Sequence, residues 1–238
     1  MLLYYIRHGD PIYDPDSLTP LGEEQAKAVA KRLALHGIDE IYMSSSARAQ
    51  QTAMPLCRLL KKEPMELDWC NEKYAHRFYG ITMEDGKRKF AVARSDIKRL
   101  FVSKELRAMG EKWYEHPALA DERFAEGEAF FTEHLEAFLA QQGYHKHPEE
   151  NWYTQDAPNE KRIAIFAHWG VGGVLMSHLL RIPYPQLVTG FGLSHSTVTV
   201  VEFREQHGMV TPHALCYGND SHLYREGLPT RYENRVYL

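Results

Sequence analysis

The sequence predicts an α/β protein, a three-layer sandwich with a mostly parallel central sheet and helices on both faces. Short, continuous apolar runs at residues 2–6 and 163–167 have the pattern of strands that are covered on both sides. Segments with helical periodicity follow both runs, and this strand–helix alternation is typical of parallel sheets. Because the chain of 238 residues shows no linker or internal repeat, we expect one domain over residues 1–238.

The helix expected after the first strand has sequence signals at both ends. Thr19 can cap its N-terminus, and Pro20 suits its first turn, where a missing N–H is harmless. Gly37 can end it in a left-handed conformation. Residues 11–16, which contain two prolines, are expected to form a loop before it. Its buried stripe has the i, i+3, i+4, i+7 spacing and consists of Ala26, Val29, Ala30 and Leu33.

The remaining elements continue this alternation, with one interruption. Residues 73–125 are charged and helical in composition, so we expect a helical insertion over the sheet's edge, where it would cap an active site. The polar stretch at 143–160 is expected to be a long loop. Further helices are expected at 47–60, 127–139 and 171–180, and further strands at 41–43, 197–203 and 210–216, the last of them antiparallel at an edge.

Composition and charge argue against several classes of partner. The formal net charge of −4 and the pI of about 6.4 disfavour nucleic acid, which selects basic surfaces. No segment is long and apolar enough to span a bilayer, and the N-terminus lacks the basic region of a signal peptide. Three widely spaced cysteines indicate a reducing compartment. We therefore expect a cytoplasmic protein with neither a nucleic-acid nor a membrane partner.

Two predicted strands end in the same way, with a histidine at the tip and a glycine within two residues. The first reads Tyr5-Ile6-Arg7-His8-Gly9-Asp10, and the second reads Ile165-Phe166-Ala167-His168-Trp169-Gly170. In open α/β sheets, ligands bind beyond the carboxyl ends of the strands. A single histidine there is more often a satisfied polar residue, but two at matching positions predict a shared pocket.

An arginine follows a third strand at the same expected edge. Arg48 lies at the start of the predicted helix at 47–60, where backbone N–H groups and the helix dipole favour an anion. Its planar guanidinium matches the geometry of a phosphate. Together with Arg7, His8 and His168, it would form a pocket for a tetrahedral dianion without a metal ion.

These residues belong to a longer series of short motifs. In chain order, the series resembles the histidine phosphatase (phosphoglycerate-mutase-like) superfamily over nearly the whole chain. The matching elements are Arg7-His8-Gly9, Leu18-Thr19-Pro20-Leu21-Gly22 with Gln25-Ala26, Arg48-Ala49-Gln50-Gln51-Thr52-Ala53, Glu72 with Gly80, Gly127-Glu128, His168, and Asn219-Asp220-Ser221-His222-Leu223.

The resemblance implies a mechanism and a role for each residue. His8 would be the nucleophile, with its second ring nitrogen held by a backbone carbonyl. Arg7, Arg48 and a protonated His168 would bind the phosphoryl oxygens. Glu72 would act as general acid and base, although Asp68, Glu66 and Glu84 are rivals for that role. No cofactor is implied.

Substrate choice is expected to depend on residues outside this shared set. Asp10, Tyr13 and Trp169 are expected in the substrate pocket, and Trp169 stands where the family usually has glycine. The expected substrate is a small-molecule phosphomonoester that the sequence does not identify. The sequence is compatible with a homodimer but does not determine the oligomeric state.

Three other functions compete with a phosphatase. A cofactor-dependent phosphoglycerate mutase is disfavoured because the loop after His8 is short, running from Tyr13 directly to Leu18-Thr19. A metallophosphoesterase is disfavoured because the thirteen histidines form no cluster at metal-ligand spacing. A non-catalytic phospho-ligand binding module is disfavoured because such modules commonly lose the nucleophile or a pocket arginine, and both are present here.

Overall fold

The computed structural model describes residues 1–230 and contains a six-stranded central sheet. Three neighbouring pairs of strands are parallel, and the two pairs at one side are antiparallel. The sheet is therefore mostly parallel, as expected. Its order is β14 (His213–Asn219), β11 (Val198–Glu202), β1 (Leu2–Arg7), β10 (Arg162–Ala167), β4 (Glu40–Met43) and β5 (Met65–Glu66).

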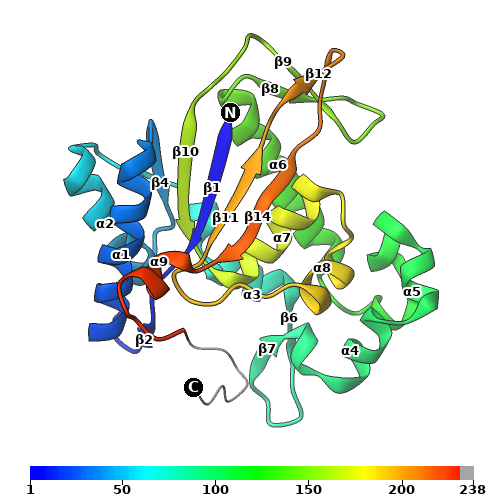
Figure 1. Ribbon diagram of the computed structural model, residues 1–238. Coiled ribbons are helices and arrows are strands. Elements are labelled where there is room, and N and C mark those ends of the chain that lie inside the picture. The colour runs from blue at the N-terminus through cyan, green and yellow to red at the C-terminus, as the bar shows by residue number, and fades with distance from the viewer. Residues whose placement is uncertain (231–238) are drawn as a thin grey trace.

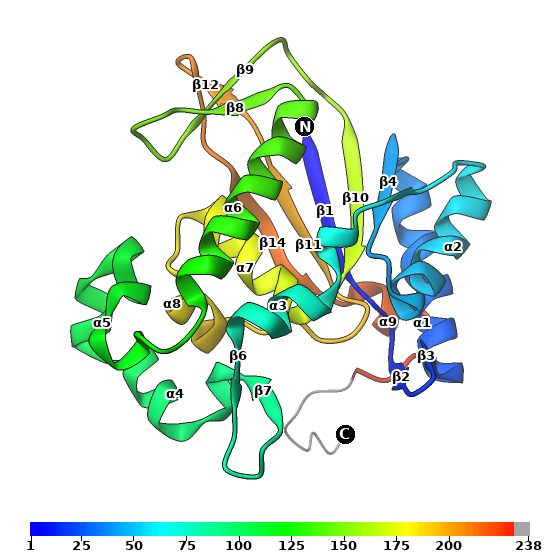
Figure 2. The same ribbon diagram turned by 180° about the vertical axis from the view of Figure 1, so that it is seen from behind.

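Helices cover both faces of this sheet, which confirms the three-layer sandwich (Figures 1 and 2). Alternate residues of β1 enter two separate cores: Leu3 and Tyr5 pack on one face, and Tyr4 and Ile6 on the other. One outer layer contains α1 (Pro20–His36), α2 (Ala47–Leu60) and α9 (Ser221–Arg225). The other contains α3 (Glu72–Tyr79), α6 (Phe124–Gln141), α7 (Trp169–Leu180) and α8 (Tyr184–Gly190).

The helix signals read from the sequence are confirmed. Thr19 caps α1, and its Oγ1 accepts a hydrogen bond from the Gly22 amide at 3.0 Å. Gly37 ends the helix with a positive φ of 71°, but its ψ of 133° differs from that of the left-handed cap expected there. The predicted stripe of α1 is buried, and α2 spans the expected residues behind an N-cap formed by Ser46.

Two segments expected to be loops are hairpins instead. Residues 11–16 lie in β2 (Pro11–Tyr13) and β3 (Asp16–Leu18). The polar stretch at 143–160 contains β8 (Tyr144–Lys146) and β9 (Tyr153–Gln155), which join β12 (Glu205–Gln206) and β13 (Met209–Val210) in a small antiparallel sheet. Buried Tyr144 and Tyr153 anchor this second hairpin, so two aromatic residues outweigh its polar composition.

The last predicted strand is interrupted. Residues 210–216 were expected as one strand, but Pro212 has no N–H to donate and separates β13 from β14. As expected, β14 pairs antiparallel with β11 at the sheet's edge.

The segment at 73–125 lies beyond the carboxyl ends of the parallel strands (Figure 1). It is largely helical, as expected, but it also contains an unexpected hairpin. Phe101 and Trp113 are almost fully buried and join this segment to the core. After α3 it contains β6 (Gly80–Thr82), β7 (Arg88–Phe90), α4 (Ser95–Phe101), α5 (Lys104–Ala108) and 3₁₀ turns at Ala91–Ala93, Gly110–Glu115 and Pro117–Leu119. Within residues 1–230, no helix has the length and apolar character needed to cross a membrane.

Candidate active site

The parallel strands bring three predicted residues to one edge of the sheet. His8 directly follows β1, His168 directly follows β10, and Arg48 lies in the first turn of α2 after β4. The His8 and His168 rings are 5.2 Å apart between centroids. The structure therefore brings these three side chains together at the edge where the strands end.

His8 is held as one neutral tautomer. Its Nδ1 lies 2.7 Å from the carbonyl oxygen of Gly9, and since a carbonyl only accepts, Nδ1 must carry the proton. Burial, followed by the nearby His168 and Arg7, holds the pKa of His8 well below its usual range. The Nε2 lone pair is therefore available for nucleophilic attack.

His168 is also neutral, which differs from the protonated form expected from the sequence. Arg48 Nη2 can only donate, and it lies 3.2 Å from His168 Nδ1, so the proton is on Nε2. That Nε2 lies 2.9 Å from Ser44 Oγ. Burial, then Arg48 and Arg7, holds the pKa of His168 well below its usual range. A phosphate dianion in the site would oppose this shift.

Arg48 is oriented by the hairpin that precedes α1. Asp16 Oδ1 accepts a hydrogen bond from Arg48 Nη1 at 2.6 Å, and Asp16 Oδ2 accepts one from the Ala47 amide at 2.8 Å. The Tyr13 ring lies 5.5 Å from the Arg48 guanidinium carbon. The unexpected β2–β3 hairpin thus places one carboxylate and one aromatic ring against this arginine.

Arg7 has a partner that the sequence analysis missed. Its Nη1 donates to the Leu193 carbonyl, and its Nη2 donates to His195 Nε2 at 2.8 Å. The His195 ring centroid is 5.4 Å from that of His8. His195 precedes β11, which runs antiparallel to β1, so the amino end of β11 meets the carboxyl ends of the parallel strands. A strand-end rule for parallel sheets overlooks such a residue; recognising β11 as antiparallel would have pointed to it.

Glu72 reaches the same region from the first turn of α3. Its two carboxyl oxygens accept hydrogen bonds from the Gly170 amide at 2.9 Å and the Val171 amide at 3.2 Å. Burial raises the pKa of Glu72, while these amides oppose the change. The carboxyl group therefore lies beside the N-terminus of α7, two residues beyond His168.

The rival carboxylates are placed elsewhere. Asp68 is half exposed and bonded to Ser45, Tyr74 and Lys73, which lowers its pKa to about 2. Glu66 and Glu84 are exposed and, like Asp68, do not line the cavity that contains His8. Geometry therefore favours Glu72 among the four.

A cavity of about 1650 Å³ opens over these groups. Asp10 lines it but is buried, with Oδ2 accepting a hydrogen bond from Thr19 Oγ1 at 2.8 Å. Trp169 lines it too and contacts the Phe90 ring at 5.1 Å. His168 is fully buried and is not among the lining residues. The predicted residues that line the cavity are Arg7, His8, Asp10, Tyr13, Arg48, Glu72 and Trp169.

Metal-ligating side chains do not gather in the part of the chain that the structure describes. No group of three or more histidine, cysteine, aspartate or glutamate residues there could hold a metal ion.

A comparison with protein-family models identifies the family to which this chain belongs. The family model of the histidine phosphatase superfamily (branch 1) matches residues 3–139, more than half of the chain. The chain belongs to the histidine phosphatase superfamily. A curated relative, the PE-PGRS family protein PE_PGRS11 of Mycobacterium tuberculosis, is 36% identical over 89 residues. That match covers 33% of this chain and only 15% of the relative's length.

Solved structures of the same fold cover nearly all of this superfamily member. A mycobacterial hydrolase matches with a TM-score of 0.61 and 18% identity, covering 92% of this chain and 98% of its own. A phosphoserine phosphatase from Entamoeba histolytica matches with a TM-score of 0.59 and 20% identity, over 93% of this chain and 98% of its own. The α-ribazole phosphatase from Shigella flexneri matches with a TM-score of 0.58 and 19% identity, over 92% of this chain and 97% of its own. At these identities, the comparisons establish the fold.

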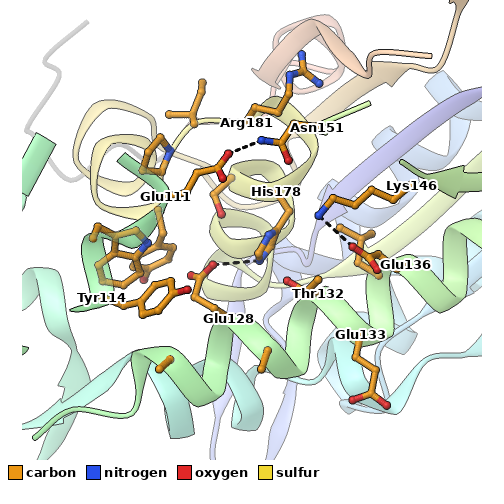
Figure 3. Close-up of a pocket in the computed structure, with 18 of the residues that line it drawn as sticks. Glu111, Tyr114, Glu128, Thr132, Glu133, Glu136, Lys146, Asn151, His178 and Arg181 are labelled. Atoms are coloured by element: carbon orange, nitrogen blue, oxygen red, sulfur yellow. Dashed lines mark hydrogen bonds and ion pairs between the residues drawn. The ribbon is translucent and has the colours of Figure 1, made fainter. Parts of the chain in front are cut away.

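The Gly127-Glu128 element of this superfamily member lies at a second cavity, of about 640 Å³ (Figure 3). Glu128 accepts a hydrogen bond from Tyr79 at 2.8 Å and lies 3.5 Å from His178 Nε2. A Cβ at position 127 would lie 2.7 Å from Phe78 Cβ, so glycine allows α6 to approach α3 closely. This motif therefore packs the helices of one layer, and Glu128 does not line the cavity over His8.

Proposed function

We propose that this protein is a metal-independent phosphatase that hydrolyses a phosphomonoester through a phosphohistidine on His8. The observation that carries the proposal is the fixed tautomer of His8: the Gly9 carbonyl accepts a hydrogen bond from Nδ1–H, which leaves Nε2 as the nucleophilic atom. The phosphatase activities named for several structures of this fold favour hydrolysis over phosphoryl transfer.

The first half-reaction transfers the phosphoryl group to the enzyme. His8 Nε2 attacks phosphorus, and the bond from phosphorus to the leaving-group oxygen breaks. Protonated Glu72 donates its proton to that oxygen, which is consistent with its raised pKa. Arg7 and Arg48 stabilise the charge on the phosphoryl oxygens, where fixed cations contribute strongly.

The second half-reaction releases inorganic phosphate. The Glu72 carboxylate accepts a proton from water as the water oxygen attacks phosphorus and the phosphorus–nitrogen bond breaks. His8 returns to its neutral form, and Glu72 is again protonated. Ser44 and Arg48 fix the orientation of His168 next to His8 throughout.

The sequence adds three proposals about context. The net charge of −4 favours a small-molecule substrate over nucleic acid. The scattered cysteines support a reducing, cytoplasmic compartment. Continuous motifs support one domain over residues 1–238, with a cap at about 73–125 whose residues line the cavity.

The direct test is hydrolysis of p-nitrophenyl phosphate in excess EDTA by the wild-type protein and by His8→Ala. We expect turnover that resists the chelator and is abolished in the variant. His36→Ala, at the exposed end of α1, is the matched control and should keep full activity.

Each alternative gives a different result. Loss of activity in EDTA with recovery on metal addition would indicate a metallophosphoesterase. Phosphorylation of His8 without release of phosphate, but with transfer to an added hydroxyl acceptor, would indicate a mutase. Binding of inorganic phosphate with no turnover of any phosphomonoester would indicate a binding module.

A further inference from the structure

Beyond the catalytic residues, the cavity has a charge opposite to that of the whole chain. The protein carries a net charge of −4, yet Asp10 and Glu72 are the only acidic side chains among the described residues that line the cavity. The cap segment contributes six further lysines and arginines: Lys73, Arg77, Arg88, Lys89, Lys98 and Arg123.

Three of these six cations already have partners. Lys73 pairs with Asp68, Arg123 pairs with Glu126, and Arg88 donates to the Gly80 carbonyl. Arg77, Lys89 and Lys98 form no ion pair with any acidic side chain in residues 1–230. They come from three separate elements: α3, β7 and α4. All three are exposed and line the same cavity, so an anion bound there can pair with them without displacing an acidic partner.

The hairpin strand that carries Lys89 is fixed against the catalytic end of the cavity. Its neighbour Phe90 contacts Trp169 at 5.1 Å and His76 at 5.3 Å. A Cβ at Gly170 would lie 2.3 Å from the Phe90 ring, so the ring packs directly on the start of α7, where Glu72 binds. The backbone that carries Lys89 is thus held in place relative to the Glu72 carboxyl.

Arg77 is also separated along α3 from Glu72, which lies beside the phosphoryl site. Arg77 follows Glu72 by five residues in α3, which corresponds to about 7.5 Å along a helix axis. A substrate with only one phosphate would leave this part of the cavity without a counter-charge.

Resting on the function proposed above, we propose that the substrate carries a second anionic group, such as another phosphate, which Arg77, Lys89 and Lys98 bind. These residues select the substrate, whereas Arg7 and Arg48 bind the phosphoryl group that is transferred. The preferred substrate class is therefore a small organic phosphate with two or more anionic groups.

The test compares 1,6-hexanediol bisphosphate with hexyl phosphate, which differ by one phosphate on the same chain. At about 50 mM salt, we expect kcat/KM for the bisphosphate to be at least about tenfold higher, and the ratio to shrink near 500 mM because these cations are exposed. Arg77→Gln and Lys98→Gln should each lower the ratio by about threefold or more while changing kcat/KM for hexyl phosphate by less than about twofold.

Lys87→Gln is the matched control, because it removes one positive charge from the hairpin that carries Lys89, at a position that does not line the cavity. A ratio near one for the wild type, or an equal loss in Lys87→Gln, would overturn the inference. Failure of the proposed function is distinguishable, since turnover of p-nitrophenyl phosphate would then depend on added metal, survive in His8→Ala, or be absent. In that case calorimetric titration of the wild type decides: tighter binding of the bisphosphate supports the second anion site, and equal affinity refutes it.

Discussion

At the scale of single residues, hydrogen bonds in the candidate site fix which ring nitrogen of each histidine carries the proton. Gly9 keeps the His8 proton on Nδ1, and Arg48 keeps the His168 proton on Nε2. Arg7 donates to His195 Nε2 and so keeps the His195 proton on Nδ1. Each imidazole is thereby held in one orientation. Burial, together with the neighbouring imidazole and arginines, holds the pKa values of His8 and His168 well below the usual range, which leaves the His8 Nε2 lone pair available for attack.

Glu72→Gln separates the two roles of this residue. The loss of the acid should lower kcat for an alkyl phosphate by about 10²–10⁴-fold, with a smaller effect on p-nitrophenyl phosphate, whose leaving group needs little protonation. In the wild type, kcat/KM for the alkyl phosphate should fall as pH rises through the raised pKa of Glu72, because the free enzyme must hold the proton. The variant should lack this limb.

Steady-state rates for both substrates between pH 4 and 9 give the measurement. Asp68→Asn removes a nearby exposed carboxylate and should leave both the rates and the pH profile nearly unchanged. An unchanged basic limb in Glu72→Gln would assign the acid to another group.

His195 is predicted to position Arg7. Removal of its Nε2 acceptor in His195→Ala should weaken inhibition by inorganic phosphate by about 10- to 100-fold, the range expected for a hydrogen bond to a charged group. His195→Gln keeps an acceptor oxygen and should recover part of this affinity. If the His195→Ala and His195→Gln variants bind phosphate equally well, the contact between His195 and Arg7 has no positioning role.

At the scale of elements, glycine sets the distance between α1 and the loop that carries His8. A Cβ at Gly22 would lie 2.3 Å from the Asp10 carbonyl oxygen, and a Cβ at Gly9 would lie 2.6 Å from the Gly22 carbonyl oxygen. Both obstacles are backbone atoms, which cannot rotate away. The Gly9 and Gly22 motifs found in the sequence are therefore one structural contact.

Gly22→Ala should lower both stability and activity. Alanine is the better helix former by about 1 kcal/mol, yet the clash should make the net change a loss of about 2 kcal/mol or more. Urea unfolding and kcat for p-nitrophenyl phosphate measure the two effects. Gly190→Ala is the control, since nothing lies within 4 Å of its Cβ, and it should change stability by less than about 0.5 kcal/mol.

Elements with strong local signals could be predicted from the sequence, and the short hairpins could not. The caps at Thr19 and Gly37 and the apolar strands depend on neighbouring residues, so the sequence alone reveals them. Tyr144 pairs with Gln155 and Tyr153 pairs with Lys146 across a hairpin of three-residue strands, which are too short for alternation to be recognised. His195 was missed for a related reason: its place at the site depends on the direction of β11, a long-range property.

At the scale of the whole molecule, charge is distributed unevenly between two cavities. Cations surround the larger one, whereas the smaller one contains the Glu128–His178 pair (Figure 3). Burial raises the pKa of Glu128 from its ordinary 4.5 to about 7 and lowers that of His178 to about 4, with Lys146 adding to the second shift. Both side chains are less than one-fifth exposed, so solvent screens these effects only weakly.

The two shifts act on folding in opposite directions. The folded protein holds the Glu128 proton more tightly, so this group stabilises the fold below pH 4.5 and loses that contribution as pH rises through 7. His178 binds its proton less tightly in the folded state, so stability falls as pH drops from 6.5 through 4. The opposing slopes partly cancel between pH 4.5 and 6.5, and the wild type should show a flat stability profile there.

Single substitutions should expose each slope. Relative to the wild type, Glu128→Gln should gain about 2–3 kcal/mol in free energy of unfolding between pH 4.5 and 7, because the variant has no carboxyl to ionise. His178→Asn should lose a similar amount relative to the wild type between pH 4 and 6.5. Urea unfolding at half-unit pH steps measures both, with Glu133→Gln on the same helix reporting the loss of an exposed charge. Differences that stay constant with pH in both variants would show that the cavity does not shift these groups, and the flat wild-type profile would then need another cause.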